Sequence, residues 1–175
     1  MKYALVIWLL GSLWLASCIS EHENEKQGVS ADVQVGDPLP VFEVTMADGQ
    51  QVNTDSLLGK RAVVVFFHTT CPDCQKELPR LDSLYRAHHQ ESDFRLICVA
   101  RAQKKEEIQP FWEREHLSLP YSPQPDRSIY NLFAGSIIPR IYIASPDGIV
   151  RFTHDDKDMP SFRQLEEEVR NGLSE

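Results

Sequence analysis

The chain has 175 residues, which is enough for one domain with its own hydrophobic core. With 42% hydrophobic and 25% charged residues, its composition is that of a globular protein, which excludes wholesale disorder and a fibrous chain. The 18 Lys and Arg residues against 26 Asp and Glu residues give a net charge of −8. Binding to nucleic acid is therefore not expected, because phosphate recognition rests on clustered basic side chains.

The N-terminal residues predict a targeting segment. Lys2 is followed by an apolar run over residues 3–16, which is too short for a stable membrane-spanning helix but has the length of a signal peptide. Residues 15–18 read Leu-Ala-Ser-Cys and resemble a bacterial lipobox, where the cysteine thiol receives the lipid. We expect a lipoprotein signal peptide over residues 1–17 and a lipidated Cys18 that anchors the chain to a membrane. The alternative is an ordinary cleaved signal with an incidental cysteine.

Two further parts are expected after the signal. Residues 18–34 comprise the lipidated cysteine and a flexible acidic tether, because they contain almost no side chains that a core could bury. Regular patterns begin at about residue 35, and we expect one domain over residues 35–175.

Unbroken β-branched and aromatic runs in this domain predict buried strands, and apolar residues spaced by three and four predict helices. The expected elements in chain order are a hairpin over 41–44 and 51–52, a short helix over 54–58, a strand over 62–67, a helix over 72–89, a strand over 94–100, helices over 105–115 and 128–133, a strand pair over 137–143 and 148–153, and a helix over 161–171. Thr54 is expected to cap the short helix, and Pro79 to kink the long one. This order predicts an α/β sandwich of three layers.

The candidate chemistry lies at the start of the 72–89 helix. Cys71-Pro72-Asp73-Cys74 directly follows a predicted strand, and two thiols at this spacing in a first helical turn can close a disulfide. The helix N-terminus favours a thiolate at Cys71. Half of a zinc site is the alternative, but no second Cys or His pair stands at a matching spacing. The motif therefore favours a redox dithiol that needs no metal and no cofactor.

Several other reactive side chains have less specific contexts. Cys98 lies inside an apolar strand and is expected to be a small core residue. His68 either tunes the thiolate or is an ordinary loop histidine. Arg140 either places a cation near the dithiol or is a surface arginine. His88 and His89 are expected to be solvated.

Residues 66–79, which read FFHTTCPDCQKELP, resemble the active-site stretch of thioredoxin-like thiol–disulfide oxidoreductases of the TlpA/ResA group. Three further segments agree with this group in order: 35–40 with its opening, 135–139 with its cis-proline loop, and 145–148 with its hairpin turn. The resemblance covers residues 35–170. It implies a thioredoxin-like three-layer α/β sandwich, with a central mixed β-sheet and an added N-terminal β-hairpin.

Helix geometry predicts the roles of the two cysteines, and the resemblance implies roles for two further residues. Cys71 is the expected attacking thiol, and Cys74, one turn into the helix, the expected resolver of the mixed disulfide. Glu77 lies on the same helix face as Cys74, where a half-buried carboxylate would have a raised pKa, and the resemblance implies that it takes the proton of Cys74. A solvent-exposed glutamate is the alternative. Pro139, after Ile138, is implied to be the cis-proline that presents backbone to a substrate strand, with a trans loop proline as the alternative.

These expectations describe a membrane-anchored oxidoreductase of the bacterial cell envelope, on the periplasmic face or the cell surface. Its expected partners are protein thiols and disulfides outside the cytoplasm and an upstream electron donor in the membrane. Asp73 places negative charge beside the thiolate, which predicts a reductant. A peroxiredoxin-type peroxidase is one alternative, although Val64 and His68 stand where that chemistry needs Pro and Thr or Ser. A non-enzymatic binding lipoprotein is the other.

Overall fold

The computed structural model describes residues 32–172, so the expected signal peptide and Cys18 lie outside the described residues. Its centre is a five-stranded sheet in the order β5-β4-β3-β6-β7. The strands are β3 (Arg61–Phe67), β4 (Phe94–Ala100), β5 (Tyr121–Ser122), β6 (Arg140–Ala144) and β7 (Val150–His154). The β3–β4 and β4–β5 pairs are parallel, and the β3–β6 and β6–β7 pairs are antiparallel. The sheet is therefore mixed, as expected.

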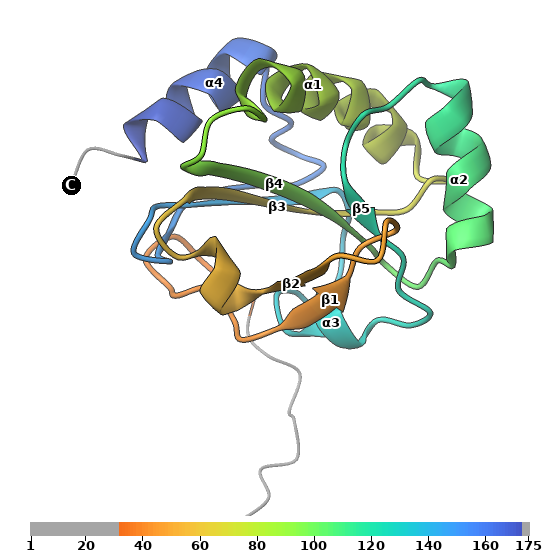
Figure 1. The fold of residues 1–175 in the computed structure, drawn as a ribbon, viewed down its shortest axis with the longest axis horizontal. Helices are drawn as coiled ribbons and strands as arrows, with labels where there is room; N and C mark the ends of the chain where they lie inside the picture. Colours follow the sequence, from red (N-terminus) through yellow and green to blue (C-terminus); the bar gives the residue numbers. More distant parts are fainter. Residues whose placement is uncertain (1–31, 173–175) are drawn as a thin grey trace, which may run out of the picture.

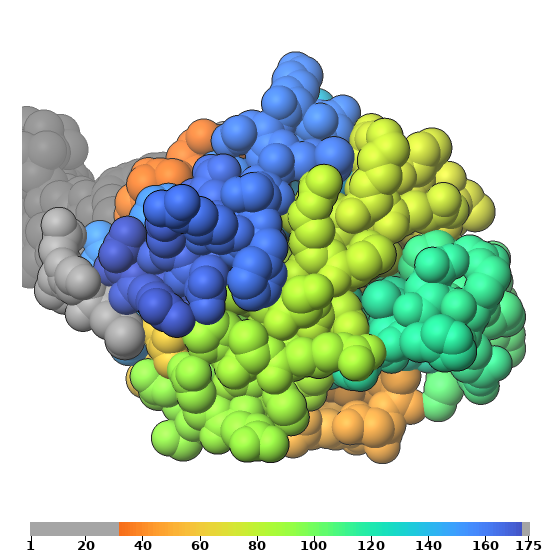
Figure 2. Space-filling model, turned by 90° about the horizontal axis from the view of Figure 1, so that it is seen from above, coloured from red at the N-terminus to blue at the C-terminus, as the bar shows by residue number. Residues whose placement is uncertain are grey.

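Helices cover both faces of this sheet (Figure 1). They are α1 (Pro72–His88), α2 (Lys105–Arg114), α3 (Ser128–Asn131) and α4 (Phe162–Asn171). The α1 and α4 helices lie next to each other on one face, as Figure 2 also shows, and α2 lies toward the β5 edge. The opposite face carries α3 and a hairpin of β1 (Glu43–Thr45) and β2 (Gln51–Asn53). The structure confirms the three-layer α/β sandwich with an added N-terminal hairpin.

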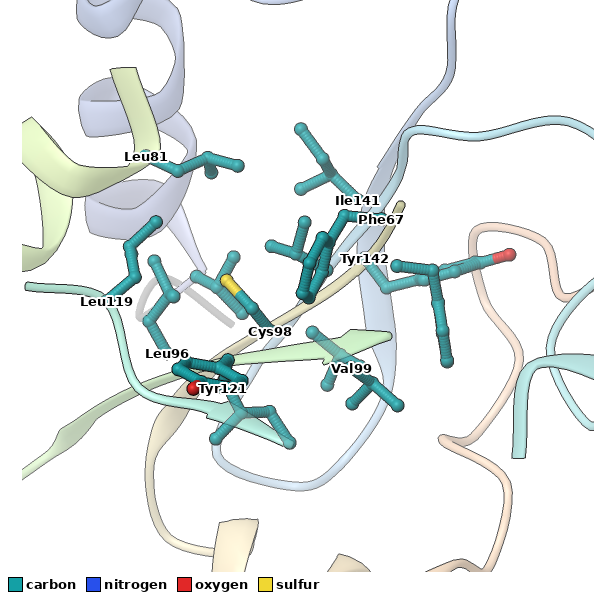
Figure 3. Close-up of a cluster of buried hydrophobic side chains, with 14 of the residues drawn as sticks. Phe67, Leu81, Leu96, Cys98, Val99, Leu119, Tyr121, Ile141 and Tyr142 are labelled. Atoms are coloured by element: carbon teal, nitrogen blue, oxygen red, sulfur yellow. The ribbon is translucent and has the colours of Figure 1, made fainter. Parts of the chain in front are cut away.

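The core lies on both sides of β3 and β4, whose side chains are almost all buried. Cys98 is fully buried in β4, with Leu81 of α1, Leu119 and Tyr121 around it (Figure 3). Burial raises the pKa of its thiol, so Cys98 is held as a neutral side chain. The expectation of a core cysteine is confirmed.

The short helix after the hairpin differs from its prediction. It is a single 3₁₀ turn, Thr54–Leu57, and Asn53 is its N-cap, with Oδ1 accepting from the backbone N–H of Ser56 at 2.9 Å. The prediction that Thr54 caps this helix is therefore wrong by one residue. Its side chain is buried instead, where Oγ1 donates to the carbonyl of Pro40 at 2.7 Å.

Other element boundaries also differ from their predictions: the first hairpin strand is Glu43–Thr45 and not 41–44, and three further elements are shorter than expected. The β6 strand begins at Arg140, because Ile137 has a φ of +69° and the Ile138–Pro139 bond is cis. The β7 strand begins two residues after Gly148, whose φ of +82° belongs to the turn. The α3 helix is a single turn that ends at Asn131. Pro79 lies inside α1, which continues through it.

Two solvation predictions need correction. His88 is buried, since only 5% of the residue is exposed, and its Nδ1 lies 2.9 Å from a carboxylate oxygen of Glu91. Its ring packs beside Phe94 at the end of α1. His89 is exposed, as expected. Residues 32–34, expected in the tether, pack on the domain, where the N–H of Val33 donates to the carbonyl of Phe133 at 2.8 Å.

Candidate active site

Cys71 begins the α1 helix as its N-cap residue. Its Sγ accepts a hydrogen bond from the backbone N–H of Cys74 at 3.4 Å, and Pro72 occupies the first turn, where its missing N–H costs nothing. The N–H of Cys71 itself donates to the carbonyl of His68 at 3.0 Å, which closes the turn after β3. The sulfur therefore lies at the positive end of the helix dipole, where a thiolate is stabilised.

Burial distinguishes the two thiols of the motif. Cys71 is partly exposed, whereas Cys74 is fully buried against the sheet. Burial, together with the hydrogen bond to Cys71, raises the pKa of the Cys74 thiol strongly. Both thiols are free in this structure. A partner disulfide can thus reach Cys71 from solvent, while Cys74 needs a nearby acceptor before it can act as a thiolate.

Glu77 lies one turn beyond Cys74 and is fully buried. Its Oε2 accepts from Nη1 of Arg80 at 2.8 Å, and its Oε1 is a buried oxygen without a hydrogen-bond partner. Burial raises the pKa of this carboxyl group, and the Arg80 hydrogen bond and charge only partly oppose that. The alternative of a solvent-exposed helix glutamate is therefore wrong.

The loop before β6 approaches the dithiol from the other side. The Ile138–Pro139 bond is cis, as the resemblance implied, and both residues are buried. The Sγ of Cys71 donates to the carbonyl of Ile138 at 3.5 Å. The structure thus brings together three of the predicted site residues that come from two distant segments, Cys71 and Cys74 from α1 and Pro139 from the loop.

Two glutamines hold the turn in front of the cysteines, and the sequence reading missed both. Oε1 of Gln103 accepts from the N–H of Thr69 at 3.0 Å, and its Nε2 donates to the Thr69 hydroxyl at 2.5 Å. Nε2 of Gln75 donates to the Thr69 carbonyl at 2.7 Å. Gln103 is buried and lies just after β4. It is 34 residues from Thr69 in the chain, so no local sequence pattern could have paired the two residues.

His68 and Arg140, whose effect on the dithiol the sequence leaves open, have different surroundings. Burial and the nearby Arg101 lower the pKa of His68, so this side chain is neutral at pH 7. Arg140 is not a surface arginine, because only 11% of its side chain is exposed and its Nη2 lies 2.5 Å from Oδ2 of Asp32. An effect of Arg140 on the dithiol stays a prediction.

Two kinds of feature are absent from the part of the chain that the structure describes. Within residues 32–172, no group of three or more His, Cys, Asp and Glu side chains is arranged to hold a metal ion. No helix in the same range is long and apolar enough to cross a membrane.

A dithiol at a helix start, above a mixed sheet and opposite a cis-proline loop, defines a thioredoxin-fold redox protein. Residues 35–153 match the AhpC/TSA family, and the chain belongs to this family. Among curated proteins it is similar to the thiol–disulfide oxidoreductase ResA of Bacillus cereus, with 26% identity over 127 residues, covering 71% of this chain and 73% of the relative. The ResA of Bacillus subtilis is 23% identical over 118 residues, covering 67% and 65% of the two chains.

Solved structures show the same similarity. A protein from Bacteroides thetaiotaomicron described as a protein disulfide isomerase superposes with a TM-score of 0.76 at 26% identity, covering 82% of this chain and 92% of the other. StoA of Bacillus subtilis superposes with a TM-score of 0.64 at 22% identity, covering 76% and 98% of the two chains, which supports the fold. The dithiol site and the relatives together identify the chain as a disulfide oxidoreductase.

Proposed function

We propose that this protein is a membrane-anchored thiol–disulfide oxidoreductase that reduces disulfide bonds of protein partners outside the cytoplasm. The observation that carries the proposal is the asymmetry of the two thiols. Cys71 is partly exposed and is the N-cap residue of α1, whereas Cys74 is buried one turn into the helix. This arrangement suits a reaction in which one thiol attacks and the other resolves.

The proposed reaction has two exchange steps. The Cys71 thiolate attacks one sulfur of the partner disulfide, which forms a mixed disulfide and releases the first partner thiolate. Cys74 then loses its proton and attacks the Cys71 sulfur. The Cys71–Cys74 disulfide forms, and the second partner sulfur leaves as a thiolate. Two electrons pass to the partner, so a dithiol donor is needed to reduce the protein again, and we propose that this donor lies in the membrane.

Glu77 is the proposed acceptor of the Cys74 proton. It lies one turn from Cys74 on the buried side of α1, and its unpaired Oε1 leaves one oxygen free to receive a proton. Its raised pKa brings the carboxyl group closer to the range in which it can both take up and return a proton near neutral pH. We propose Pro139 and the neighbouring backbone as the surface on which a partner strand docks, since the Ile138 carbonyl already faces Cys71.

The membrane anchor is proposed from the sequence. The apolar run over residues 3–16 and the lipobox-like residues 15–18 support acylation of Cys18, which would place the domain at the cell envelope. The tether would leave the domain at Asp32, the first described residue. The same placement would expose the dithiol to proteins on the periplasmic face or the cell surface.

Trapping of partners tests the proposed roles of the thiols. Cys74→Ala is expected to accumulate mixed disulfides with partner proteins, because the attack still occurs and nothing resolves the product. Cys71→Ala is expected to accumulate few. Non-reducing gels and mass spectrometry of the captured species measure both.

Cys98→Ala is the matched control for this experiment. It removes a buried sulfur from the core, so the free energy of unfolding is expected to fall by about 1 kcal/mol while turnover stays unchanged. If Cys71→Ala is the variant that accumulates partners, the two roles are inverted. If Cys98→Ala abolishes turnover, the two-cysteine reaction is incomplete.

The direction of electron flow is tested by the reduction potential. The carboxylate of Asp73 lies between the cysteines, and its ion pair with Lys76 at 2.9 Å is exposed and therefore weak. Its negative charge disfavours the dithiolate form, so we expect a potential near that of thioredoxin, about −270 mV, and not near that of DsbA, about −120 mV. Equilibration with a glutathione series measures it. A value above about −180 mV would contradict a reductant.

A further inference from the structure

The loop that faces Cys71 contains a backbone conformation that its own sequence does not favour. Ile137 has a φ of +69°, in the left-handed region where a β-branched side chain is strained and glycine is the usual residue. The next residue, Ile138, supplies the carbonyl that accepts from Cys71 Sγ. Such a conformation persists only where the surrounding structure holds it.

The hydroxyl of Tyr130 is placed to hold this conformation. Tyr130 lies in α3, only 1% of it is exposed, and its Oη is 2.6 Å from the carbonyl oxygen of Ile137. The carbonyl oxygen of Ser136 is also within hydrogen-bond distance of this Oη, so the single hydroxyl proton is shared between the two carbonyls. One buried side chain therefore contacts the carbonyl groups of both peptides that flank the Ile137 Cα.

The ring of Tyr130 is itself fixed by its neighbours. The guanidinium groups of Arg101 and Arg127 lie 5.3 and 5.2 Å from its centroid, and Phe66 of β3 packs edge-on at 5.4 Å. Arg127 also donates from Nη2 to the carbonyl of Gly135 at 2.8 Å, at the start of the same loop. The N–H of Arg101 is bonded to the last residue of β3, so the cluster is tied to the strand that leads to the cysteines.

We propose that Tyr130 is a positioning residue for disulfide exchange with protein partners: its hydroxyl holds Ile137 in the left-handed conformation and thereby keeps the Ile138 carbonyl and Pro139 against Cys71. This inference rests on the proposed function. A folded partner must dock on the loop before its disulfide reaches Cys71, whereas a small disulfide needs access to the sulfur alone. Tyr130 therefore affects the apparent affinity for a protein disulfide and not the reactivity of Cys71 toward a small one.

Tyr130→Phe and Tyr142→Phe form a matched pair. Tyr142 is also fully buried in this aromatic cluster, but its hydroxyl donates at 3.2 Å to the carbonyl of Phe133, outside the loop. Reduced protein is mixed with excess insulin, as a protein disulfide, or with oxidised glutathione, as a small one, and the single-turnover rate is followed against concentration.

Tyr130→Phe is expected to raise the apparent KM for insulin about three- to tenfold, the effect of losing one hydrogen bond, with the rate for glutathione unchanged. Tyr142→Phe is expected to leave the apparent KM for insulin and the rate with glutathione unchanged. Both variants are expected to lower Tm to a similar extent, because each loses one buried hydroxyl. Equal effects of the two variants on the KM for insulin would overturn the inference, since both would then reflect general destabilisation.

A rescue variant tests the link to Ile137. Ile137→Gly in the Tyr130→Phe background is expected to restore at least half of the lost affinity on a logarithmic scale, because glycine adopts a φ of +69° without strain. A double variant no better than Tyr130→Phe would show that the hydroxyl does not act through Ile137. If the wild-type protein reduces neither disulfide, the proposed function fails, whereas an active wild type with an unaffected Tyr130→Phe variant overturns the Tyr130 inference alone.

Discussion

Glu77 buries a carboxyl group beneath the dithiol with one oxygen on Arg80 and the other unpaired. A buried polar atom without a partner costs free energy, so a side chain of this kind needs a reason to be present. The proton transfer from Cys74 proposed above would provide that reason, because the same burial raises the pKa of both groups. At the scale of single residues, burial thus gives Glu77 the raised pKa that its proposed role as proton acceptor requires.

Glu77→Gln tests this relation through the resolving step. The amide keeps the shape and the burial but cannot accept a proton, so release of the partner from the mixed disulfide is expected to slow by about 10²-fold, the low end of general-base catalysis. Attack by Cys71 is expected to stay unchanged. Rapid mixing with a peptide disulfide at several pH values separates the two rates. The exposed Glu106→Gln is the control.

Stability gives a second readout for the same substitution. The pKa of Glu77 is raised above its ordinary value of 4.5 chiefly by burial, so the folded state binds the proton more tightly than the unfolded state. Stability is therefore lost as the pH rises from about 4.5 through the folded pKa. Urea unfolding is expected to show Glu77→Gln more stable than wild type at pH 7.5, with the difference closing toward pH 4. A constant difference across this range would contradict a raised pKa.

At the scale of elements, a buried histidine joins β7 to α4. Nε2 of His154 lies 2.7 Å from a carboxylate oxygen of Glu168 on α4, and Nδ1 lies 3.2 Å from one of Asp158 in the loop between them. Burial by itself lowers the pKa of His154, but the hydrogen bonds and charges of the two carboxylates outweigh it and raise the pKa. The positive charge of protonated His154 also acts on Glu77 of α1, where it lowers the pKa of the carboxyl group and so partly opposes the effect of burial. The imidazolium thus links the sheet to the helix layer above it.

His154→Gln is expected to weaken this link in a pH-dependent way. A raised folded pKa means that the contribution of His154 is complete below about pH 6.5 and is lost as the pH rises through the folded value. The variant is therefore expected to be about 2 kcal/mol less stable than wild type at pH 6, the scale of a charge-assisted hydrogen bond, and closer to it at pH 9. Thermal unfolding at the two pH values measures the difference. The exposed His89→Gln variant should show no such trend.

At the scale of the whole molecule, the proposed tether meets the domain beside its active-site loop. Oδ1 of Asp32 accepts from the N–H of Gly135 at 2.9 Å, while its Oδ2 pairs with Arg140 after the cis-proline. Asp32 therefore bridges the two ends of the loop that faces Cys71. Residues 18–31 would reach at most about 50 Å when fully extended, so an anchored domain would work close to its membrane.

Cys18→Ser tests the anchor. If Cys18 is acylated, the variant is expected to move from the membrane fraction to the soluble fraction or to remain unprocessed. Its activity toward a soluble disulfide is expected to stay unchanged, because the proposed reaction uses only Cys71, Cys74 and their neighbours. Fractionation and mass spectrometry of the N-terminal peptide measure both. Recovery of an acylated Cys18→Ser protein in the membrane fraction would show that the lipobox reading is wrong.

The features that the sequence alone determined are local or rest on a short motif. The long strands and helices follow from runs of neighbouring residues, and the Cys71–Cys74 pair at the helix start follows from spacing. The cis-proline was implied by a resemblance carried by a few residues, and the structure confirms it.

Only the tertiary structure decided the contacts between side chains distant in the chain. Gln103 binds Thr69 across 34 residues, and Asp32 reaches Arg140 across 108. The burial of His88 and Glu77, which the sequence reading missed or underestimated, also depends on what packs over α1. Periodicity records which face of an element is apolar, but a polar side chain on that face acquires its partner and its pKa only when another element covers it. That is why the dithiol was predictable from the sequence, and the groups proposed to position and deprotonate it were less so.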